Sequence, residues 1–249
     1  MRFVSWLFCI FTCLASDAYS VFYYFIPPKN WDLISSDKLP SGTVIAFVEK
    51  SHKPVKASIN LGIEKTTIAL EDYVEKAKKK ILANRSNTWT SLGTITKPSW
   101  KGYLSQIDSK NGCGDIRSLQ CIISDSHQIY VLTGVGLKED HIKNTPIFLD
   151  IFESFSIEKD SFSSIDDKQL KVAYTKDKEA LVTVWQSFIK AYPKESLSEI
   201  FKNKEFQKKH WLPFEQKLQK NYKKFGLFWQ AQAAHEIQLD LLSNNLKKT

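Results

Sequence analysis

The pattern of apolar and polar positions changes its period along the chain. Between residues 43 and 136, apolar side chains mostly alternate with polar ones, which is typical of strands that bury one face. We expect six strands here, at 43–49, 55–63, 91–97, 101–108, 116–124 and 128–136. The last four follow one another through short polar connections. Such an order predicts an antiparallel meander.

Two segments of this first part show helical spacing instead. Residues 69–82 place apolar side chains on one stripe, with acidic residues in the first turn and lysines in the last, as the helix dipole favours. The stretch FLDIFESFSI, residues 148–157, begins with helical spacing and ends in alternation. It predicts a helix that leads into a closing strand at 155–159. We therefore expect an α+β domain over residues 21–158, an antiparallel sheet with flanking helices.

This order of elements resembles the PsbP/Mog1-like (DcrB-like) fold over about residues 22–158. The resemblance depends on the tyrosine of QIYVLT and on a closing motif made of Phe148, Phe152, Ser154, Phe155 and Ile157. Members of that group look like non-catalytic binding modules, such as an extrinsic photosystem subunit in plants, a Ran-binding factor in fungi and small envelope lipoproteins in bacteria. The resemblance implies a fold and a functional class. It transfers no site residue.

The rest of the chain is polar and then helical. Residues 159–175 are predicted to be a linker or a final pair of strands. Helical spacing then predicts an all-α extension over 176–249, a helical hairpin or three helices at 176–192, at 196–206 and at about 212–244. Ser196 and Glu199 have the spacing of a capping box at the start of the second helix.

The first twenty residues have the layout of a secretory signal peptide. Arg2 precedes an apolar run of about 13 residues, and small residues follow it. An uncleaved N-terminal membrane anchor is the alternative, although the run is shorter than the roughly 20 residues that span a bilayer. A lipoprotein modified at Cys13 is a third interpretation. We therefore expect an exported protein, in the periplasm or envelope or secreted.

Cleavage after residue 20 would leave two cysteines, Cys113 and Cys121. In an oxidising compartment they could form a disulfide. If Cys121 lies within a strand and Cys113 in the loop before it, their Cα atoms would lie too far apart for a bond unless the loop curls back. Two unpaired thiols are the alternative.

Motifs for catalysis or cofactor binding do not occur in the sequence. The chain has no G-x-S-x-G, Walker, G-x-G-x-x-G or H-E-x-x-H motif. Its histidines are isolated, and Asp166-Asp167 falls in the polar linker, where solvated charge is the simplest interpretation. We expect no enzyme, no metal, no cofactor and no small-molecule substrate. A hydrolase site assembled from distant residues is kept as an alternative.

Charge is distributed unevenly along the chain. The formal net charge is +8, and residues 176–249 contribute +6 of it, with 14 lysines and 8 acidic residues. A possible basic contact face consists of Lys208, Lys209, Lys217, Lys220, Lys223 and Lys224. It would suit an anionic membrane surface or an acidic protein partner, and an ordinary solvated helix face is the competing interpretation. Nucleic acid is not expected as a partner, because export separates the protein from the usual nucleic-acid targets. The basic residues also do not alternate with aromatic ones on a strand.

Together these patterns predict a non-enzymatic binding or scaffold module that is exported and associated with the envelope. A second hypothesis is a secreted effector that uses the basic helical region to contact a membrane or a host partner.

Overall fold

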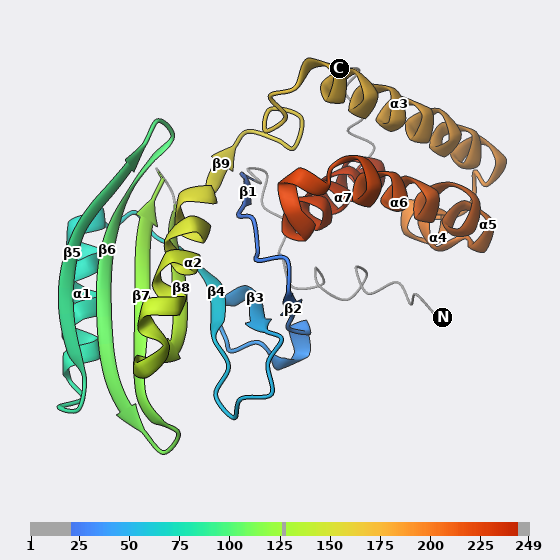
Figure 1. Ribbon diagram of the computed structural model, residues 1–249. Coiled ribbons are helices and arrows are strands. Elements are labelled where there is room, and N and C mark those ends of the chain that lie inside the picture. Colours follow the sequence, from blue (N-terminus) through green and yellow to red (C-terminus); the bar gives the residue numbers. More distant parts are fainter. Residues whose placement is uncertain (1–20, 126–127, 244–249) are drawn as a thin grey trace. The chain divides into compact units, whose positions relative to one another are not determined.

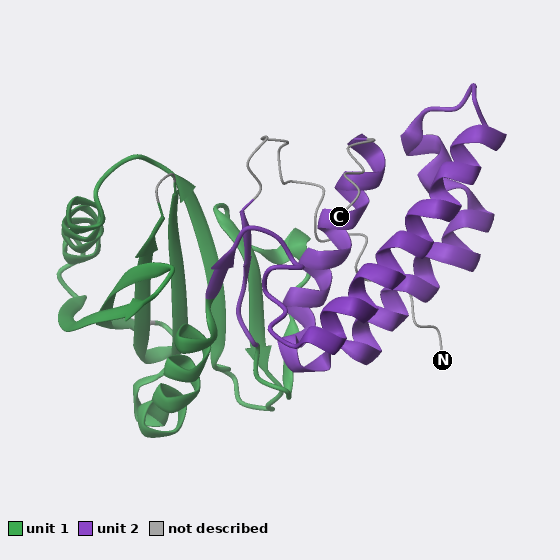
Figure 2. Cartoon of the chain, turned by 90° about the horizontal axis from the view of Figure 1, so that it is seen from above, with its two compact units in different colours: residues 1–13, 27–155 green, residues 14–26, 156–249 purple. Residues whose placement is uncertain are grey.

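The computed structural model describes residues 21–125 and 128–243 (Figure 1). These residues divide into two compact units (Figure 2). Unit 1 contains residues 27–155, and unit 2 contains residues 21–26 together with 156–243. The predicted signal peptide lies outside the described residues. Within the described ranges, no helix is both long enough and apolar enough to cross a membrane.

Unit 1 is built on one sheet of seven strands, in the order β2-β3-β4-β8-β7-β6-β5. All neighbouring strands are antiparallel. The four strands β5 to β8 form the predicted meander, and β8 then pairs with β4. The strands span Trp31–Leu33 (β2), Thr43–Glu49 (β3), Ser58–Lys65 (β4), Thr88–Lys97 (β5), Trp100–Asn111 (β6), Gly114–Ser124 (β7) and Gln128–Leu137 (β8).

The two helices of unit 1 cover opposite faces of this sheet. Helix α1 (Leu70–Leu82) packs Leu70 and Val74 against Ile129 of β8. Helix α2 (His141–Ser154) is followed by Phe155, whose ring lies 5.4 Å from that of Tyr130. Because successive side chains of a strand point to opposite faces, Ile129 and Tyr130 belong to different layers. The predicted α+β class, with helices flanking an antiparallel sheet, is confirmed. Short 3₁₀ turns, η2 and η3, occur at Ser36–Lys38 and Lys138–Asp140.

Helix α2 lies close to β8 because β8 has a glycine beneath it. A Cβ atom added at Gly134 would lie 2.4 Å from the Phe148 ring, so a larger residue would push the helix away. Trp100 of β6 donates its indole N–H to the carbonyl of Phe155 at 3.1 Å. This bond holds the end of α2 against the sheet.

The closing strand differs from its prediction in its partner. Strand β9 (Ser156–Glu158) has the predicted position, but it pairs with β1 (Phe22–Tyr24) and belongs to unit 2. The pairing joins segments more than 130 residues apart, with Tyr23 opposite Ile157. The boundary of the α+β part therefore falls at Phe155 and not at residue 158, and among the described residues this part begins at Pro27.

Unit 2 is otherwise helical, with boundaries that differ from the predicted ones. Helix α3 begins at Lys168 inside the predicted linker, because the Asp167 side chain accepts from the backbone N–H groups of Gln169 and Leu170. The predicted capping box of Ser196 and Glu199 is present. The helices are α3 (Lys168–Ala191), α4 (Leu197–Lys202), α5 (Lys204–Phe206), α6 (Leu212–Asn221) and α7 (Gly226–Ser243).

The third predicted helix is divided in two. A π-helical turn, η4 (Gln207–Trp211), joins α5 to α6, and a 3₁₀ turn, η5 (Lys223–Phe225), separates α6 from α7. Gly226 has φ 81°, a conformation that favours glycine and that ends the helical path. The continuous helix expected over 212–244 is therefore wrong.

Aromatic side chains form the core of unit 2. Trp229 stacks on Tyr222 and Phe225 at centroid distances of 5.4 and 4.9 Å. Phe22 of β1 meets the edge of Trp229 at 6.1 Å, so the N-terminal strand joins the same core. Trp185, Trp211 and Trp229 are each at most 2% exposed. Burial of such large side chains is the main source of stability in a unit of this size.

Candidate functional site

The six lysines of the predicted basic contact face are all exposed. They come from three consecutive elements, η4, α6 and η5. The aromatic residues in or between these elements are buried: Trp211, Phe214, Tyr222 and Phe225. The surface formed by Lys208, Lys209, Lys217, Lys220, Lys223 and Lys224, the lysine surface below, therefore offers charge without large aromatic side chains.

Acidic neighbours lie beside part of the lysine surface. Lys209 pairs with Glu205 on its own helical run at 2.8 Å, and Lys217 reaches Asp177 of α3 at 2.5 Å. Lys224 is close enough to Asp167 to help lower the pKa of that carboxyl, after the larger effect of the backbone N–H of Leu170. Within the described parts of the chain, Lys208, Lys220 and Lys223 have no ion pair within 4.0 Å. These three carry the uncompensated charge.

Two carboxyl groups of unit 2 are shielded from water: Glu215 is buried and Glu236 is half-buried. Burial raises the pKa of Glu215 to about 7, although the Trp211 side chain donates a hydrogen bond to it. Burial also raises the pKa of Glu236 to about 7, against the lowering effect of its bonds from Ser161 and of the charge on Lys178. Each group is thus partly protonated near neutral pH. Unit 2 is therefore more positive than its formal charge indicates.

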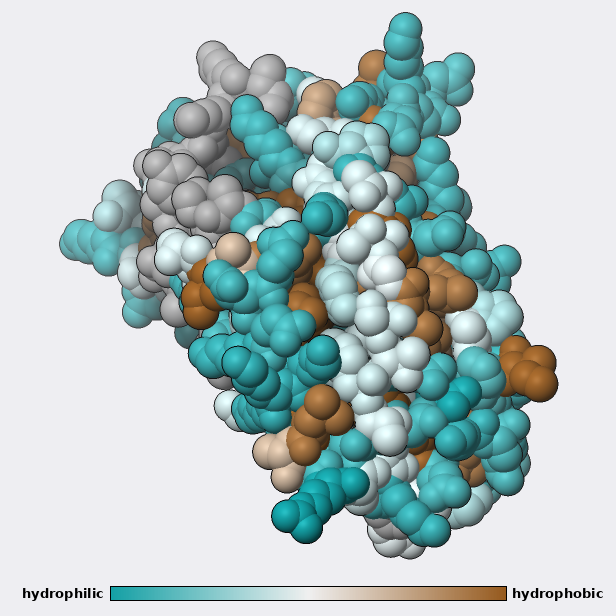
Figure 3. Space-filling view, turned by 90° about the vertical axis from the view of Figure 1, so that its left-hand side faces the viewer, coloured by the Kyte–Doolittle hydropathy of each residue, from teal (hydrophilic) through white to brown (hydrophobic). Residues whose placement is uncertain are grey.

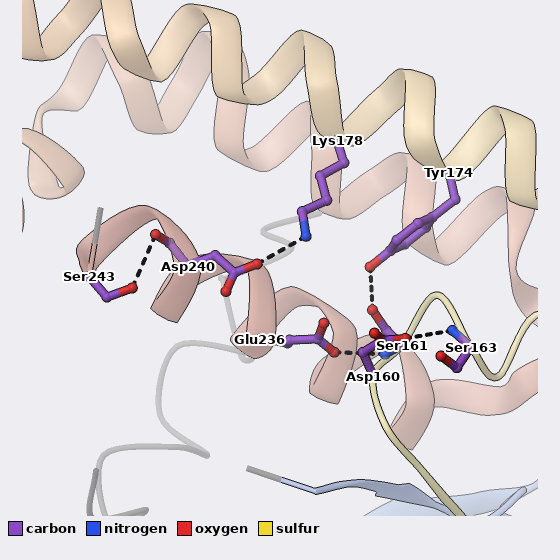
Figure 4. A network of polar contacts seen from close by, with 8 residues as sticks. All are labelled: Asp160, Ser161, Ser163, Tyr174, Lys178, Glu236, Asp240 and Ser243. Carbon is purple, nitrogen blue, oxygen red and sulfur yellow. Dashed lines mark hydrogen bonds and ion pairs between the residues drawn. The ribbon is translucent and has the colours of Figure 1, made fainter. Parts of the chain in front are cut away.

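Glu236 belongs to a polar network between α3, α7 and the loop that follows β9 (Figure 4). The backbone N–H of Ser161 donates to Glu236 at 2.8 Å, and the hydroxyl groups of Ser161 and Tyr174 lie 2.6 Å apart. Lys178 of α3 donates to Asp240 of α7 at 2.9 Å. Because Ser161 is 1% exposed, this network fastens the loop to the helices and does not present a nucleophile to a substrate.

The same loop is held by a second serine. Trp229 of α7 donates its indole N–H to the Ser164 hydroxyl at 2.6 Å, and that hydroxyl donates to the Ser161 carbonyl at 2.6 Å. Sequence reasoning treated residues 159–175 as a linker and missed this network. The available signal was the run of serines in DSFSS, since small hydroxyl side chains often bond to nearby backbone groups in loops.

Unit 1 has a small depression next to α2. Its volume is about 10 Å³, and its lining includes Arg117, His141, Asn144 and Phe148. Arg117 is held by Asp108 through two bonds of 2.7 and 2.8 Å, and the ring of His141 is bonded to Thr145 at 2.7 Å. The polar groups on its rim are therefore largely engaged with their neighbours, and the space is small for a metabolite.

The two cysteines do not come together. Cys113 lies in the turn after β6 and is exposed, whereas Cys121 lies in the middle of β7, opposite Leu104, and is fully buried. Eight residues of nearly extended chain separate their Cα atoms by roughly 25 Å, far beyond the roughly 7 Å that a disulfide spans. A bond between Cys113 and Cys121 is therefore excluded by this geometry. Burial raises the pKa of Cys121 to about 12.

The remaining candidates from the sequence are the Asp166-Asp167 pair and the histidines. Asp167 caps α3, and its neighbour Asp166 is exposed. Burial lowers the pKa of His235. Across residues 21–125 and 128–243, no group of three or more histidine, cysteine, aspartate or glutamate side chains could hold a metal ion.

Comparisons with known proteins concern the fold alone. No family model matches the chain, and no curated protein matches it. Similar solved structures include LpqN of Mycobacterium tuberculosis, described as involved in cell envelope biogenesis, with 14% identity, a TM-score of 0.45 and coverage of 57% of this chain and 87% of LpqN. Cyanobacterial PsbP (CyanoP) from Synechocystis has 10% identity, a TM-score of 0.42 and coverage of 59% and 97%.

A protein of Bacteroides thetaiotaomicron has 11% identity, a TM-score of 0.37 and coverage of 91% of this chain and 76% of its own. A PsbP is thus among the similar structures, in agreement with the weak resemblance predicted from the sequence. At these scores the similarities carry no argument about activity, ligand or partner.

Proposed function

We propose that this chain is an exported, non-enzymatic binding module, and that the lysine surface of unit 2 contacts an acidic protein partner. The observation that carries the proposal is that the basic side chains of this region are exposed while an acidic side chain among them is buried. Six lysines on three consecutive elements are exposed, while Glu215, which lies among them in the sequence, is buried and has a raised pKa. Such a surface attracts acidic partners from a distance and favours their association.

An acidic protein fits this surface better than a membrane does. Helices that lie in a membrane interface usually place tryptophan, phenylalanine or leucine on the lipid side, next to the basic residues. Here Trp211, Phe214 and Phe225 point into the core and cannot enter a bilayer. Attraction to lipid would then depend on charge alone, which gives weaker and more salt-sensitive binding.

Two other functions remain as alternatives. A secreted effector would use the same lysines on a host protein, so the experiment below applies to it as well. A hydrolase would need a nucleophile next to a base at the surface. The buried position of Ser161 disfavours the network of Figure 4 for that role.

The test compares two charge reversals with equal changes in net charge. One triple variant changes Lys208, Lys220 and Lys223 to Glu. The control changes Lys29, Lys38 and Lys56 of unit 1, which are also exposed, to Glu. Binding of labelled polyglutamate, as a model acidic chain, and of vesicles with phosphatidylglycerol is measured across a salt series.

We expect the first variant to lose polyglutamate binding about tenfold or more, and the control to lose much less, because close charges dominate when salt is present. Equal losses in both variants would show that only net charge matters. Binding to vesicles but not to polyglutamate would replace the proposed protein partner with a membrane.

A further inference from the structure

Strand β5 is a long edge of the sheet that carries little charge. It spans Thr88–Lys97, and its first nine residues are all uncharged and either exposed or half-buried. Lys97 is the only charged residue of the strand. The opposite edge, β2, is only three residues long and contains Asp32. Natural sheets usually blunt an edge with charges, proline or short length, because unpaired backbone groups invite another strand.

One protective feature interrupts β5. Its register against β6 shifts between Ser91 and Gly93, so that Leu92 is an extra residue in a bulge. The straight segments on either side, 88–91 and 93–97, have nearly equal length. The Leu92 side chain is 46% exposed. Figure 3 views the side on which β5 lies in Figure 1, where a pale band of residues of intermediate hydropathy runs between hydrophilic residues and smaller hydrophobic patches.

Helix α1 lies beside this edge with its charges separated along its length. Tyr73 donates to Glu64 of β4, so that flank of α1 faces the middle of the sheet. On the other flank Glu71 pairs with Lys101 of β6, next to β5. Helical spacing puts four residues on the flank toward β5: Glu71, Glu75, Lys78 and Leu82. This flank is acidic in its first half and basic or apolar in its second.

We propose that a second copy of this chain pairs with β5, antiparallel and about a two-fold axis at Leu92, so that one sheet continues through both copies. Segment 88–91 of each copy then pairs with segment 93–97 of the other, and the two Leu92 side chains meet at the axis. The proposal concerns unit 1 and does not depend on the function proposed for unit 2.

Charge complementarity favours a second copy as the occupant. A two-fold axis perpendicular to the sheet places both α1 helices on the same face and makes them antiparallel. Glu75 of one copy then faces Lys78 of the other, and the exposed Leu82 approaches Glu71 and its neighbours. Since α1 contacts both β5 and β7 and so lies above β6, the two helix axes are about three strand spacings, or roughly 14 Å, apart. Long side chains can meet across that distance.

The first test measures self-association of the full chain by sedimentation velocity between about 1 and about 100 µM, a range over which mass action populates a dimer of moderate affinity. We expect a concentration-dependent dimer. Leu92→Lys should abolish it, because two lysines would meet at the axis. The control is Ile142→Lys, which changes an apolar residue that is 86% exposed and lies in α2, on the face of the sheet opposite α1. A monomer throughout the range, or an unchanged dimer in Leu92→Lys, would overturn the proposal.

The second test examines the arrangement of the helices by charge exchange. Glu75→Lys alone places two lysines opposite each other in each of two symmetric contacts, and Lys78→Glu alone places two glutamates there. Each should raise the dimer dissociation constant about fivefold, in keeping with exposed like-charge pairs. The double variant combines Glu75→Lys and Lys78→Glu. It restores opposite charges across the axis and also within each helix, where Glu75 and Lys78 lie 3.7 Å apart in the native chain. A double variant as weak as the single ones would contradict the antiparallel pairing.

Discussion

The carboxylate of Glu236 in α7 accepts a hydrogen bond of 2.8 Å from the backbone N–H of Ser161, 75 positions earlier in the chain. The bond fastens the loop after β9 to the last helix, and it places a carboxyl group where burial disfavours its charge. Its consequence is a dependence of stability on pH, because Glu236 and the buried Glu215 both have a pKa raised to about 7.

Stability should fall as pH rises from about 5 to about 8. Between the ordinary pKa of 4.5 and the folded value of about 7, the folded chain holds protons that the unfolded chain has released. The loss is absent below 4.5 and complete above 7, and it amounts to at most about 3 kcal/mol for each group. Urea unfolding at several pH values measures it.

The matched variant is Glu215→Gln with Glu236→Gln, which removes both titrations and keeps side-chain oxygens that can accept hydrogen bonds. We expect a flatter pH profile and a higher stability at pH 8 than in the native chain. The comparison leaves the other nearby charged groups unchanged. These are Lys178 and Asp160, which also act on Glu236, and His235, whose pKa burial shifts in the opposite direction. An identical slope in native and variant chains would contradict the raised pKa values.

Acid should weaken unit 1 through a different group. Hydrogen bonds from Arg117, with a smaller contribution from Lys138, lower the pKa of Asp108 from 3.8 to about 2. The stability that the charged form contributes is present above pH 3.8 and is lost as pH falls toward 2, about 2 kcal/mol in all. Asp108→Asn should lose a similar amount already at pH 7. Asp115→Asn, whose pair with Lys110 is exposed and 3.8 Å long, should change the unfolding free energy by less than about 0.5 kcal/mol.

Gly134→Ala should destabilise unit 1. The new methyl group would lie 2.4 Å from the Phe148 ring, and overpacking of this kind costs about 1–3 kcal/mol. Gly112→Ala is the control, because nothing lies within 4 Å of its Cβ position. Thermal unfolding of both variants distinguishes them, and equal stability would mean that α2 does not pack closely on β8.

Cys121 should resist alkylation in the native protein. Its side chain is fully buried, and burial raises its pKa to about 12, so almost no thiolate forms near pH 8. Iodoacetamide treatment followed by peptide mapping should leave Cys121 unmodified until denaturant is added. A peptide that links Cys113 to Cys121 would contradict the long separation between them along β7.

Alternation along the first part of the chain was enough to predict the strands of the meander. Ile129 and Tyr130 face opposite apolar layers of the sheet. The strand that contains them can be predicted from the residue pattern within a few positions. The helix at 69–82 was equally predictable, because Leu70 and Val74 recur at helical spacing and the charges follow the dipole. These features depend on local periodicity, which the sequence shows directly.

Only the tertiary structure decided which segments pair over long distances. The pairing of Phe22–Tyr24 with Ser156–Glu158 moved the closing strand into unit 2, and nothing near either segment marks the other as its partner. The burial of Glu215 and Glu236 likewise depends on side chains that arrive from other helices. By itself the sequence determined the class of each part and the excess of lysine. Folding decided which charges stay in water and which edge of the sheet is left open, since both depend on contacts between residues far apart in the chain.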